Sequence, residues 1–311
     1  MYDLLVITGP TATGKTALGV EAARSLNGEV VSADSMQVYT GMDIGTAKPS
    51  RGEMRGVPHH MIDAADPRED FSAAKYAALA AACVEDIRAR GKLPIVVGGT
   101  GLYIDGLLRG TEFAAAPEDP SVRAGLEEEY DALGGEAFRE KLRAVDPDRA
   151  EKLAPGDKKR LVRAMEVYTL TGETITAHDE RSRAAPPRYT ALKLALDFRE
   201  RERLYERIDR RAAKMFDDGL VDEVKRLLDG GVPPDGTAMQ GIGYKETAAY
   251  LRGEASLSDT VELVQRRSRQ YAKRQLTWLR RDGSVRWIRW DNEPDIATVR
   301  RFSTVFPVGK P

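Results

Sequence analysis

The stretch that decides the fold lies near the start of the chain and reads Gly9-Pro10-Thr11-Ala12-Thr13-Gly14-Lys15-Thr16. It matches the pattern G-x-x-x-x-G-K-[ST], in which glycines let backbone N–H groups converge on phosphate oxygens. Residues 4–8 are mostly apolar and predict a buried strand, and residues 16–26 predict a helix. The positive end of that helix and the Lys15 ammonium favour an anion, and the Thr16 hydroxyl suits Mg²⁺. We therefore predict a di- or triphosphate site at residues 9–16, with Thr16 as a metal ligand.

Length and composition indicate a globular protein of about two domains. The chain has 311 residues, of which 41% are hydrophobic and 31% charged, and its net charge of −1 means that any basic surface must be local. Its single cysteine, Cys83, excludes a disulfide framework and a cysteine-based zinc site. We find no signal peptide and no apolar run of membrane-spanning length, so we expect a cytoplasmic protein without a membrane partner. No apolar stripe calls for an obligate protein partner, so we expect a monomer.

Strand and helix patterns alternate through the first third of the chain. Residues 29–33 and 93–97 predict buried strands, and residues 71–90 predict a long helix between them. This alternation favours an α/β fold with a doubly wound parallel sheet, similar to that of P-loop NTPases, whose ligands bind at the carboxyl ends of the strands. Asp34, Thr100 and the phosphate loop all follow strands, so we expect them at one edge of the sheet.

A charged segment with helical patterning interrupts this core. The composition changes near residues 114–117 and again near residues 184–187. We therefore predict a helical insertion domain at residues 117–187 between two parts of the catalytic core, 1–116 and 188–311. Beyond the insertion, residues 190–197 and 285–290 predict strands, and residues 200–228 and 257–281 predict helices.

An NTP hydrolase usually carries an acidic residue that closes a buried strand and holds Mg²⁺ near the γ-phosphate. The strand at residues 93–97 ends in Gly98-Gly99-Thr100, without a carboxylate. Asp34 does close a strand, but it leads into a polar and aromatic stretch, residues 35–39, which suits a planar group. Its placement fits a catalytic base at least as well as a metal ligand, and a plain turn or helix N-cap is the structural alternative. The phosphate loop could thus hold a leaving group.

The helix expected at residues 257–281 has two different sides at about 100° per residue. Apolar side chains gather on one side, namely Val261, Val264, Tyr271 and Trp278. Basic side chains gather on the other, namely Arg266, Arg267, Arg269, Lys273, Arg274, Arg280 and Arg281. A charged helix face often contacts only solvent. On this face, however, almost all charges are positive, whereas the rest of the chain is net acidic. We therefore predict that it contacts a nucleic-acid backbone.

Seven stretches that follow one another in order carry a resemblance to a known family. They are residues 9–16, Asp34 to Tyr39, Gly41 to Pro49, Val57 to Asp63, Val97 to Tyr103, Gln240 to Glu246 and Arg269 to Trp278. Together they span almost the whole chain and closely resemble the tRNA dimethylallyltransferases, or tRNA isopentenyltransferases. The resemblance is to the bacterial type, which lacks the zinc-finger extension of the eukaryotic relatives.

The resemblance implies transfer of a dimethylallyl group from dimethylallyl diphosphate to the exocyclic amine (N6) of the adenosine at tRNA position 37. Asp34 matches the family's general base, and Thr100 matches a residue that touches the reacting region. Lys15, Thr16 with Mg²⁺, and Arg211 would neutralise the departing diphosphate. Arg211 is assigned by matching residues 207–211 to the family's R-I-x-x-R, and its neighbour Arg210 leaves the assignment open by one position. A surface arginine is the structural alternative.

The resemblance also implies contacts with tRNA. Asp34 to Gln37 would line a pocket for the extruded adenosine, and the insertion would grip the anticodon stem-loop, although a solvated helix face is as good an interpretation of its charges. The complete set of expected tRNA-contacting residues is Asp34, Ser35, Met36, Gln37, Thr100, Arg123, Asp157, Arg160, Arg163, Arg269, Lys273 and Arg274.

Two other functions stay open from the sequence. A small-molecule or nucleoside kinase would use the same phosphate loop with ATP, but it leaves the basic helix unexplained. An NTP-gated RNA-binding module would use the basic helix, but it has no use for Asp34 and Thr100 at the edge of the sheet.

Overall fold

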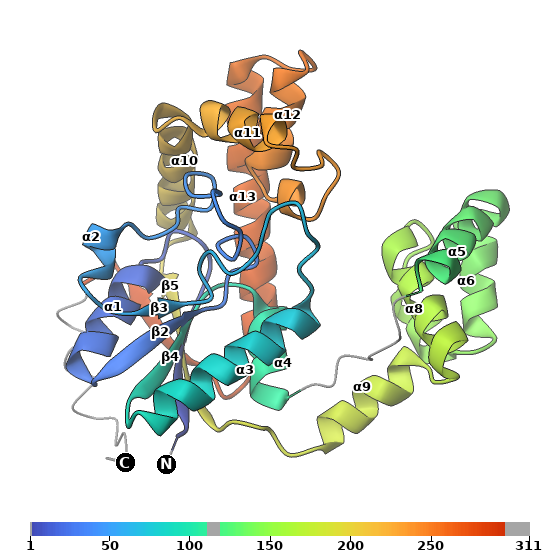
Figure 1. The fold of residues 1–311 in the computed structure, drawn as a ribbon, viewed down its shortest axis with the longest axis horizontal. Coiled ribbons are helices and arrows are strands. Elements are labelled where there is room, and N and C mark those ends of the chain that lie inside the picture. Colours follow the sequence, from blue (N-terminus) through green and yellow to red (C-terminus); the bar gives the residue numbers. More distant parts are fainter. Residues whose placement is uncertain (1, 111–118, 296–311) are drawn as a thin grey trace. The chain divides into compact units, whose positions relative to one another are not determined.

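The computed structural model describes residues 2–110 and 119–295, which form two compact units (Figure 1). One unit combines the described parts of 1–108 and 188–311, and the other comprises those of 109–187. The predicted boundary between 116 and 117 lies outside the described residues. The second boundary falls between 187 and 188, where the composition changes. No helix in the described ranges is both long and apolar enough to span a bilayer.

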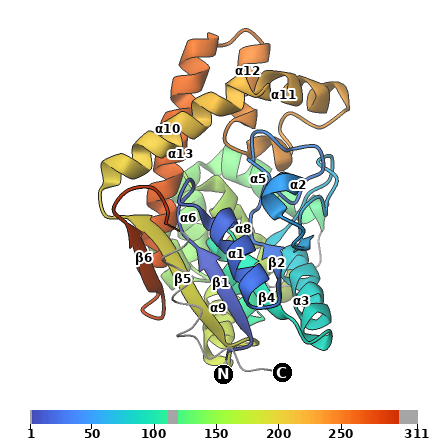
Figure 2. The ribbon, with the colours of Figure 1, turned by 90° about the vertical axis from the view of Figure 1, so that its left-hand side faces the viewer.

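A parallel sheet forms the centre of the larger unit, and Figure 2 shows its strands side by side with α1 in front of them. The strands described are β1 (Leu4–Thr8), β2 (Gly28–Ser32), β3 (His59–His60), β4 (Leu93–Val97), β5 (Ala191–Phe198) and β6 (Arg286–Trp290). Their order is β3-β2-β4-β1-β5-β6, and each neighbouring pair is parallel. The predicted α/β class is confirmed, and the strands expected at residues 190–197 and 285–290 are β5 and β6.

Helices cover both faces of the sheet because alternate side chains of a strand point to opposite faces. The elements of one face are α1 (Lys15–Ser25), α10 (Arg201–Asp217) and α13 (Leu257–Leu279), whose buried side chains share a core with Leu5 and Ile7 of β1. The elements of the other face are α3 (Ala73–Ala89) and α4 (Gly101–Arg109), which share a core with Leu4 and Val6. The sheet is therefore buried on both sides, as its apolar strands predict.

Shorter elements complete the larger unit: α2 (Arg51–Met54), α11 (Leu220–Asp229), a 3₁₀ turn (Ala238–Gln240) and α12 (Tyr244–Leu251). The helical stretch expected at residues 200–228 is present as two helices, because the chain breaks between α10 and α11. Gly219 sits at the break with φ of 101°, a conformation that only glycine adopts freely. The break redirects the chain so that Leu220 and Val224 reach the core beside α12.

The smaller unit is entirely helical in its described part: α5 (Pro120–Leu133), α6 (Gly135–Arg143), α7 (Pro147–Lys152), α8 (Lys158–Thr171) and α9 (Ile175–Ala184). It has a hydrophobic core of its own, centred on Phe138, Leu142 and Leu161, which are fully buried. The described residues that make up this core all lie between positions 122 and 175.

Candidate active site

The segments that follow β1, β2 and β4 meet at the carboxyl edge of the sheet. The phosphate loop follows β1, Asp34 follows β2, and Thr100 follows β4. The Thr100 hydroxyl accepts a hydrogen bond from the Ser35 amide at 3.1 Å, and the Thr100 amide donates to the Ala33 carbonyl at 3.1 Å. The structure thus brings together the three features that the strand pattern places at one edge.

These segments border a cavity of about 910 Å³ that lies entirely within the larger unit. Its wall combines residues 11–17 of the phosphate loop and α1, residues 34–37, residues 45–47, and side chains from α10 and α13. Thr100 is not among the lining residues but is hydrogen-bonded to Ser35, which is. The volume is in the range of small-molecule sites, so the cavity can hold a diphosphate together with a second group.

The phosphate loop has the shape that an anion site requires. Gly9 has φ of 137°, and a Cβ there would lie 2.4 Å from the Leu196 carbonyl oxygen, so no larger residue fits. Both the Thr13 hydroxyl and the Lys15 ammonium donate to the Pro10 carbonyl at 2.8 Å. From β6, the Trp290 indole N–H donates to the Thr13 carbonyl at 3.1 Å and fixes the loop from outside.

Two cations face this cavity without a partner carboxylate. Neither Lys15 nor Arg211 forms an ion pair with any of the described residues, and both line the wall. Burial and the charge of Arg211 lower the pKa of Lys15 to about 7, while Asp34 opposes the shift. Burial also lowers the pKa of Arg211. An anion bound between them would reduce the free-energy cost of keeping both cations charged in a buried place. Arg210, in contrast, is 70% exposed and pairs with Glu293 outside the cavity.

The two oxygens of Asp34 differ in their surroundings. Oδ1 accepts hydrogen bonds from the amides of Met36 at 2.9 Å and Gln37 at 3.3 Å. Oδ2 has no hydrogen-bond partner among the described residues, and the side chain borders the cavity. Asp34 is therefore a turn residue through one oxygen and leaves the other available for a proton.

Known proteins resemble this chain over almost its whole length. Residues 37–282 match the family model described as "IPP transferase". The tRNA dimethylallyltransferase of Acetivibrio thermocellus is 47% identical over 291 residues, which cover 94% of this chain and 93% of that protein. The chain belongs to the tRNA dimethylallyltransferase family.

Two solved structures extend the match to the fold. The full-length tRNA isopentenylpyrophosphate transferase of Bacillus halodurans is 40% identical, with a TM-score of 0.73 over 98% of this chain and 96% of that one. A eukaryotic dimethylallyltransferase acting on tRNA is 29% identical, with a TM-score of 0.79 over 98% of this chain and 80% of that one.

Two side chains link separate segments around the cavity by hydrogen bonds. The sequence analysis did not single them out. The Arg207 guanidinium lines the cavity and donates to the Ala12 carbonyl of the phosphate loop at 2.9 Å. The Gln275 side chain of α13 accepts from the Thr11 amide at 3.1 Å and donates to the Gly99 carbonyl at 2.9 Å. Gln275 lies in one of the seven stretches that carry the family resemblance, and Arg207 lies in the match of residues 207–211 to R-I-x-x-R; these matches were the available signal.

The basic side of α13 is divided among three environments. Arg267 pairs with Glu246, and Arg269 pairs with Asp209 of α10 at 2.5 Å. Arg274 lines the cavity with its guanidinium 5.5 Å from the Tyr271 ring centre, and Lys273 is exposed. The prediction of one continuous basic face therefore needs correction, because α10 and α12 pack against part of it and supply acidic partners.

The expected tRNA-contacting residues of the smaller unit also have partners within it. Arg123 and Arg163 both bind Glu166, with N–O distances of 2.8 Å and 2.7 Å. Arg160 is mostly exposed and pairs with Asp157 at the start of α8 at 2.6 Å. The Glu166 carboxylate of α8 is buried, so Arg123 joins α5 to α8 through this pair, whereas Arg163 pairs with Glu166 within α8.

Proposed function

We propose that this chain transfers the dimethylallyl group of dimethylallyl diphosphate to N6 of the adenosine at tRNA position 37. The observation that carries the proposal is a single cavity lined by Asp34, one of whose oxygens has no hydrogen-bond partner among the described residues, and by Lys15 and Arg211, which form no ion pair with those residues. Relatives that share almost the full length of this chain are named tRNA dimethylallyltransferases.

The cationic side of the cavity receives the diphosphate. Lys15, Arg211 and the amides of the phosphate loop stabilise the charge that develops as the carbon–oxygen bond breaks. Mg²⁺ fits this site because it takes few protein ligands beside phosphate oxygens and water, and Thr16, whose hydroxyl is such a ligand, lines the same cavity. When bound, Mg²⁺ would neutralise part of the diphosphate charge.

The carboxylate side of the cavity activates the acceptor. An adenine amine is a poor nucleophile, and Asp34 takes its proton while the new carbon–nitrogen bond forms. General-base assistance of this kind contributes about 10²–10⁴-fold. In this reaction N6 forms a bond to the dimethylallyl carbon and loses one proton to Asp34. The carbon–oxygen bond to the diphosphate breaks, and diphosphate leaves with its electron pair.

The tRNA must present its target base outside the stack. Extrusion of a base from a single-stranded loop costs a few kcal/mol at most, which makes the anticodon loop an accessible substrate. Met36 and Gln37 line the space next to Asp34 and are suited to the planar base. We assign the anticodon stem-loop to the smaller unit and to the exposed Lys273.

The test is incubation of the protein with Mg²⁺, labelled dimethylallyl diphosphate and an unmodified anticodon stem-loop RNA, without any NTP. We expect label in the RNA, and no label when the adenosine 3′ of the anticodon is replaced. Absence of label together with an RNA-stimulated ATPase activity would overturn the proposal in favour of an NTP-gated module. Label transfer from γ-labelled ATP to a nucleoside would favour a kinase.

A further inference from the structure

The segment of residues 43–47 forms the part of the cavity wall that holds Arg211. Gly45, Thr46 and Ala47 line the cavity. The Thr46 carbonyl accepts a hydrogen bond from Nη2 of Arg211 at 3.2 Å and another from the Gln37 amide group at 3.3 Å. A backbone carbonyl of this segment is thus the contact that fixes the Arg211 guanidinium in the wall.

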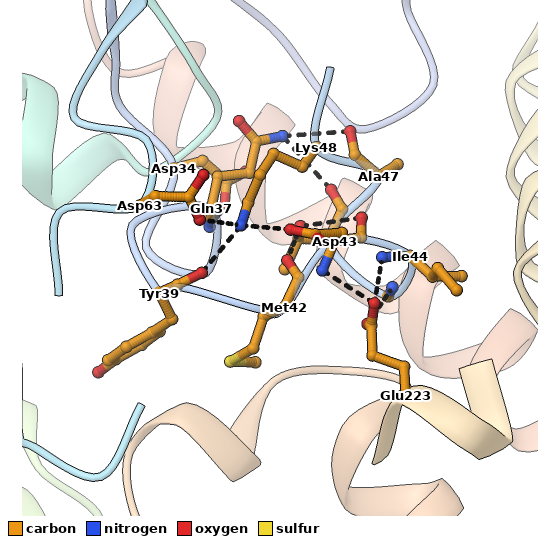
Figure 3. A network of polar contacts seen from close by, with 12 residues as sticks. Asp34, Gln37, Tyr39, Met42, Asp43, Ile44, Ala47, Lys48, Asp63 and Glu223 are labelled. Atoms are coloured by element: carbon orange, nitrogen blue, oxygen red, sulfur yellow. Dashed lines mark hydrogen bonds and ion pairs between the residues drawn. The ribbon is translucent and has the colours of Figure 1, made fainter. Parts of the chain in front are cut away.

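Glu223 of α11 anchors this segment from behind the wall (Figure 3). Its Oε2 accepts hydrogen bonds from the amides of Asp43 at 3.0 Å and Ile44 at 2.8 Å. Its Oε1 accepts from the Gly45 amide at 3.1 Å and from the Tyr244 hydroxyl at 2.6 Å. The residue is 2% exposed and is not part of the cavity wall.

Lys48 fixes the far end of the same segment, as Figure 3 also shows. Its ammonium donates to the Tyr39 carbonyl at 2.9 Å and pairs with Asp43 and Asp63, each at 2.6 Å. The side chain of Lys48 is only 6% exposed. Because both ends are held by buried charged groups, the carbonyl of Thr46 has a defined place relative to Arg211.

We propose that Glu223 is a positioning residue for the transfer reaction, which acts by holding residues 43–45 so that the Thr46 carbonyl keeps Arg211 aimed into the cavity. The inference rests on the proposed function, since it requires that Arg211 stabilise the leaving diphosphate. Glu223 touches no reacting group and acts only through the segment.

A glutamine cannot replace this carboxylate. Each oxygen of Glu223 receives two donors, and the amide nitrogen of glutamine is itself a donor with no acceptor capacity. In Glu223→Gln, two of the four donors therefore lose their partner in either orientation of the amide, and the backbone of residues 43–45 must shift. Misplacement of a group by about 1 Å can cost about 10²-fold in rate.

The experiment compares wild type, Glu223→Gln, Arg211→Ala and the double variant in steady-state transfer assays, well below their melting temperatures. We expect Glu223→Gln to reduce kcat about 10- to 100-fold while KM for tRNA changes less than about twofold. In the Arg211→Ala background the same substitution should cost less than about threefold, because the group it positions is gone. Equal losses in both backgrounds, or an unchanged kcat with a lowered Tm, would overturn the inference.

Three further variants separate positioning from a general loss of stability. Tyr244→Phe removes one donor to Glu223 and keeps all three amide bonds, so kcat should stay within about threefold of wild type. Glu29→Gln removes another buried carboxylate, at the start of β2, and should lower Tm with unchanged kcat. Gly45→Ala keeps every polar side chain but pushes its Cβ within 2.5 Å of the Tyr244 ring, so it should reproduce the kcat loss.

Gly45→Ala also serves if Glu223→Gln does not fold. A normal kcat in Gly45→Ala, or a kcat loss in Glu29→Gln as large as that in Glu223→Gln, would count against the inference. A wild-type protein that transfers nothing would instead contradict the proposed function.

Discussion

The geometry of Asp34 lets one side chain combine a structural task with the chemical task that we propose for it. Its Oδ1 is occupied by two backbone amides, which fixes the direction of the carboxylate, while Oδ2 has no hydrogen-bond partner among the described residues. A turn residue and a catalytic base were alternatives from the sequence. The geometry makes them compatible, because a base whose other oxygen is anchored needs no reorientation during proton transfer.

Asp34→Asn tests the base role with little change in shape. The asparagine carbonyl can still accept from the two amides, but the side chain cannot take the proton of the attacking amine. We expect the single-turnover transfer rate to fall about 10²–10⁴-fold, with tRNA and diphosphate affinities within about twofold of wild type. A loss of tRNA binding as large as the loss of rate would show that Asp34 serves binding instead.

Lys15 predicts a pH dependence of diphosphate binding. Its pKa is lowered to about 7 in the free protein, and a bound anion raises it again, so binding takes up a proton above pH 7. Affinity should therefore be greatest below pH 7 and should weaken as pH rises above it. Isothermal titration at pH 8 in buffers of different ionisation enthalpy measures the uptake. Lys15→Arg, which stays charged, is the control, and equal proton uptake by both proteins would contradict the prediction.

At the scale of the element, α13 serves the core, the cavity and the surface at once. Ala272 and Leu276 pack under the sheet, Gln275 joins the loops after β1 and β4, and Lys273 points to solvent. Successive residues of a helix differ by about 100°, so neighbouring positions meet different environments. Substitutions at single positions of this helix should therefore affect stability, the cavity and the surface separately.

Lys273→Ala and Arg269→Ala are a matched pair on this helix. Loss of one phosphate contact should weaken tRNA binding in Lys273→Ala and reduce the slope of log K against log salt by about one. Arg269→Ala should leave that slope unchanged and lower Tm, because it breaks the pair with Asp209 that joins α10 and α13. Filter binding across salt concentrations measures the slope. The reverse pattern would place Arg269 in the tRNA interface.

At the scale of the whole molecule, the chain has two units with separate cores. The cavity wall belongs to the larger unit throughout, and the core around Phe138 belongs to the smaller one. Packing defects in one core should therefore leave the ligand site of the other unit intact.

Phe138→Ala tests this separation. Removing a fully buried aromatic side chain should destabilise the smaller unit by about 3–5 kcal/mol. We expect a calorimetric scan to show one component at lower temperature, with diphosphate affinity unchanged and tRNA affinity reduced. If diphosphate binding falls together with tRNA binding, the two units are energetically coupled.

The sequence by itself determined the features that depend on short stretches. Residues 9–16 specify the phosphate loop because glycines and a lysine at fixed spacing dictate its backbone and charge. Apolar runs specify the buried strands, and their alternation with helices specifies a parallel sheet, whose carboxyl edge must hold the segments after β1, β2 and β4. The seven stretches and their order along the chain were enough to indicate the family.

Only the tertiary structure decided which distant residues share one environment. Glu223 lies about 180 positions from the segment that it anchors, and no local pattern distinguishes it from a solvated helix carboxylate. The same holds for Arg269, whose partner Asp209 comes from another helix, and for the choice of Arg211 over Arg210. In each case the outcome depends on which segments distant in the chain pack together: α11 and α10 with residues 43–46, and α13 with α10. Buried hydrogen bonds and ion pairs between them are set by distance in space, which sequence spacing does not encode.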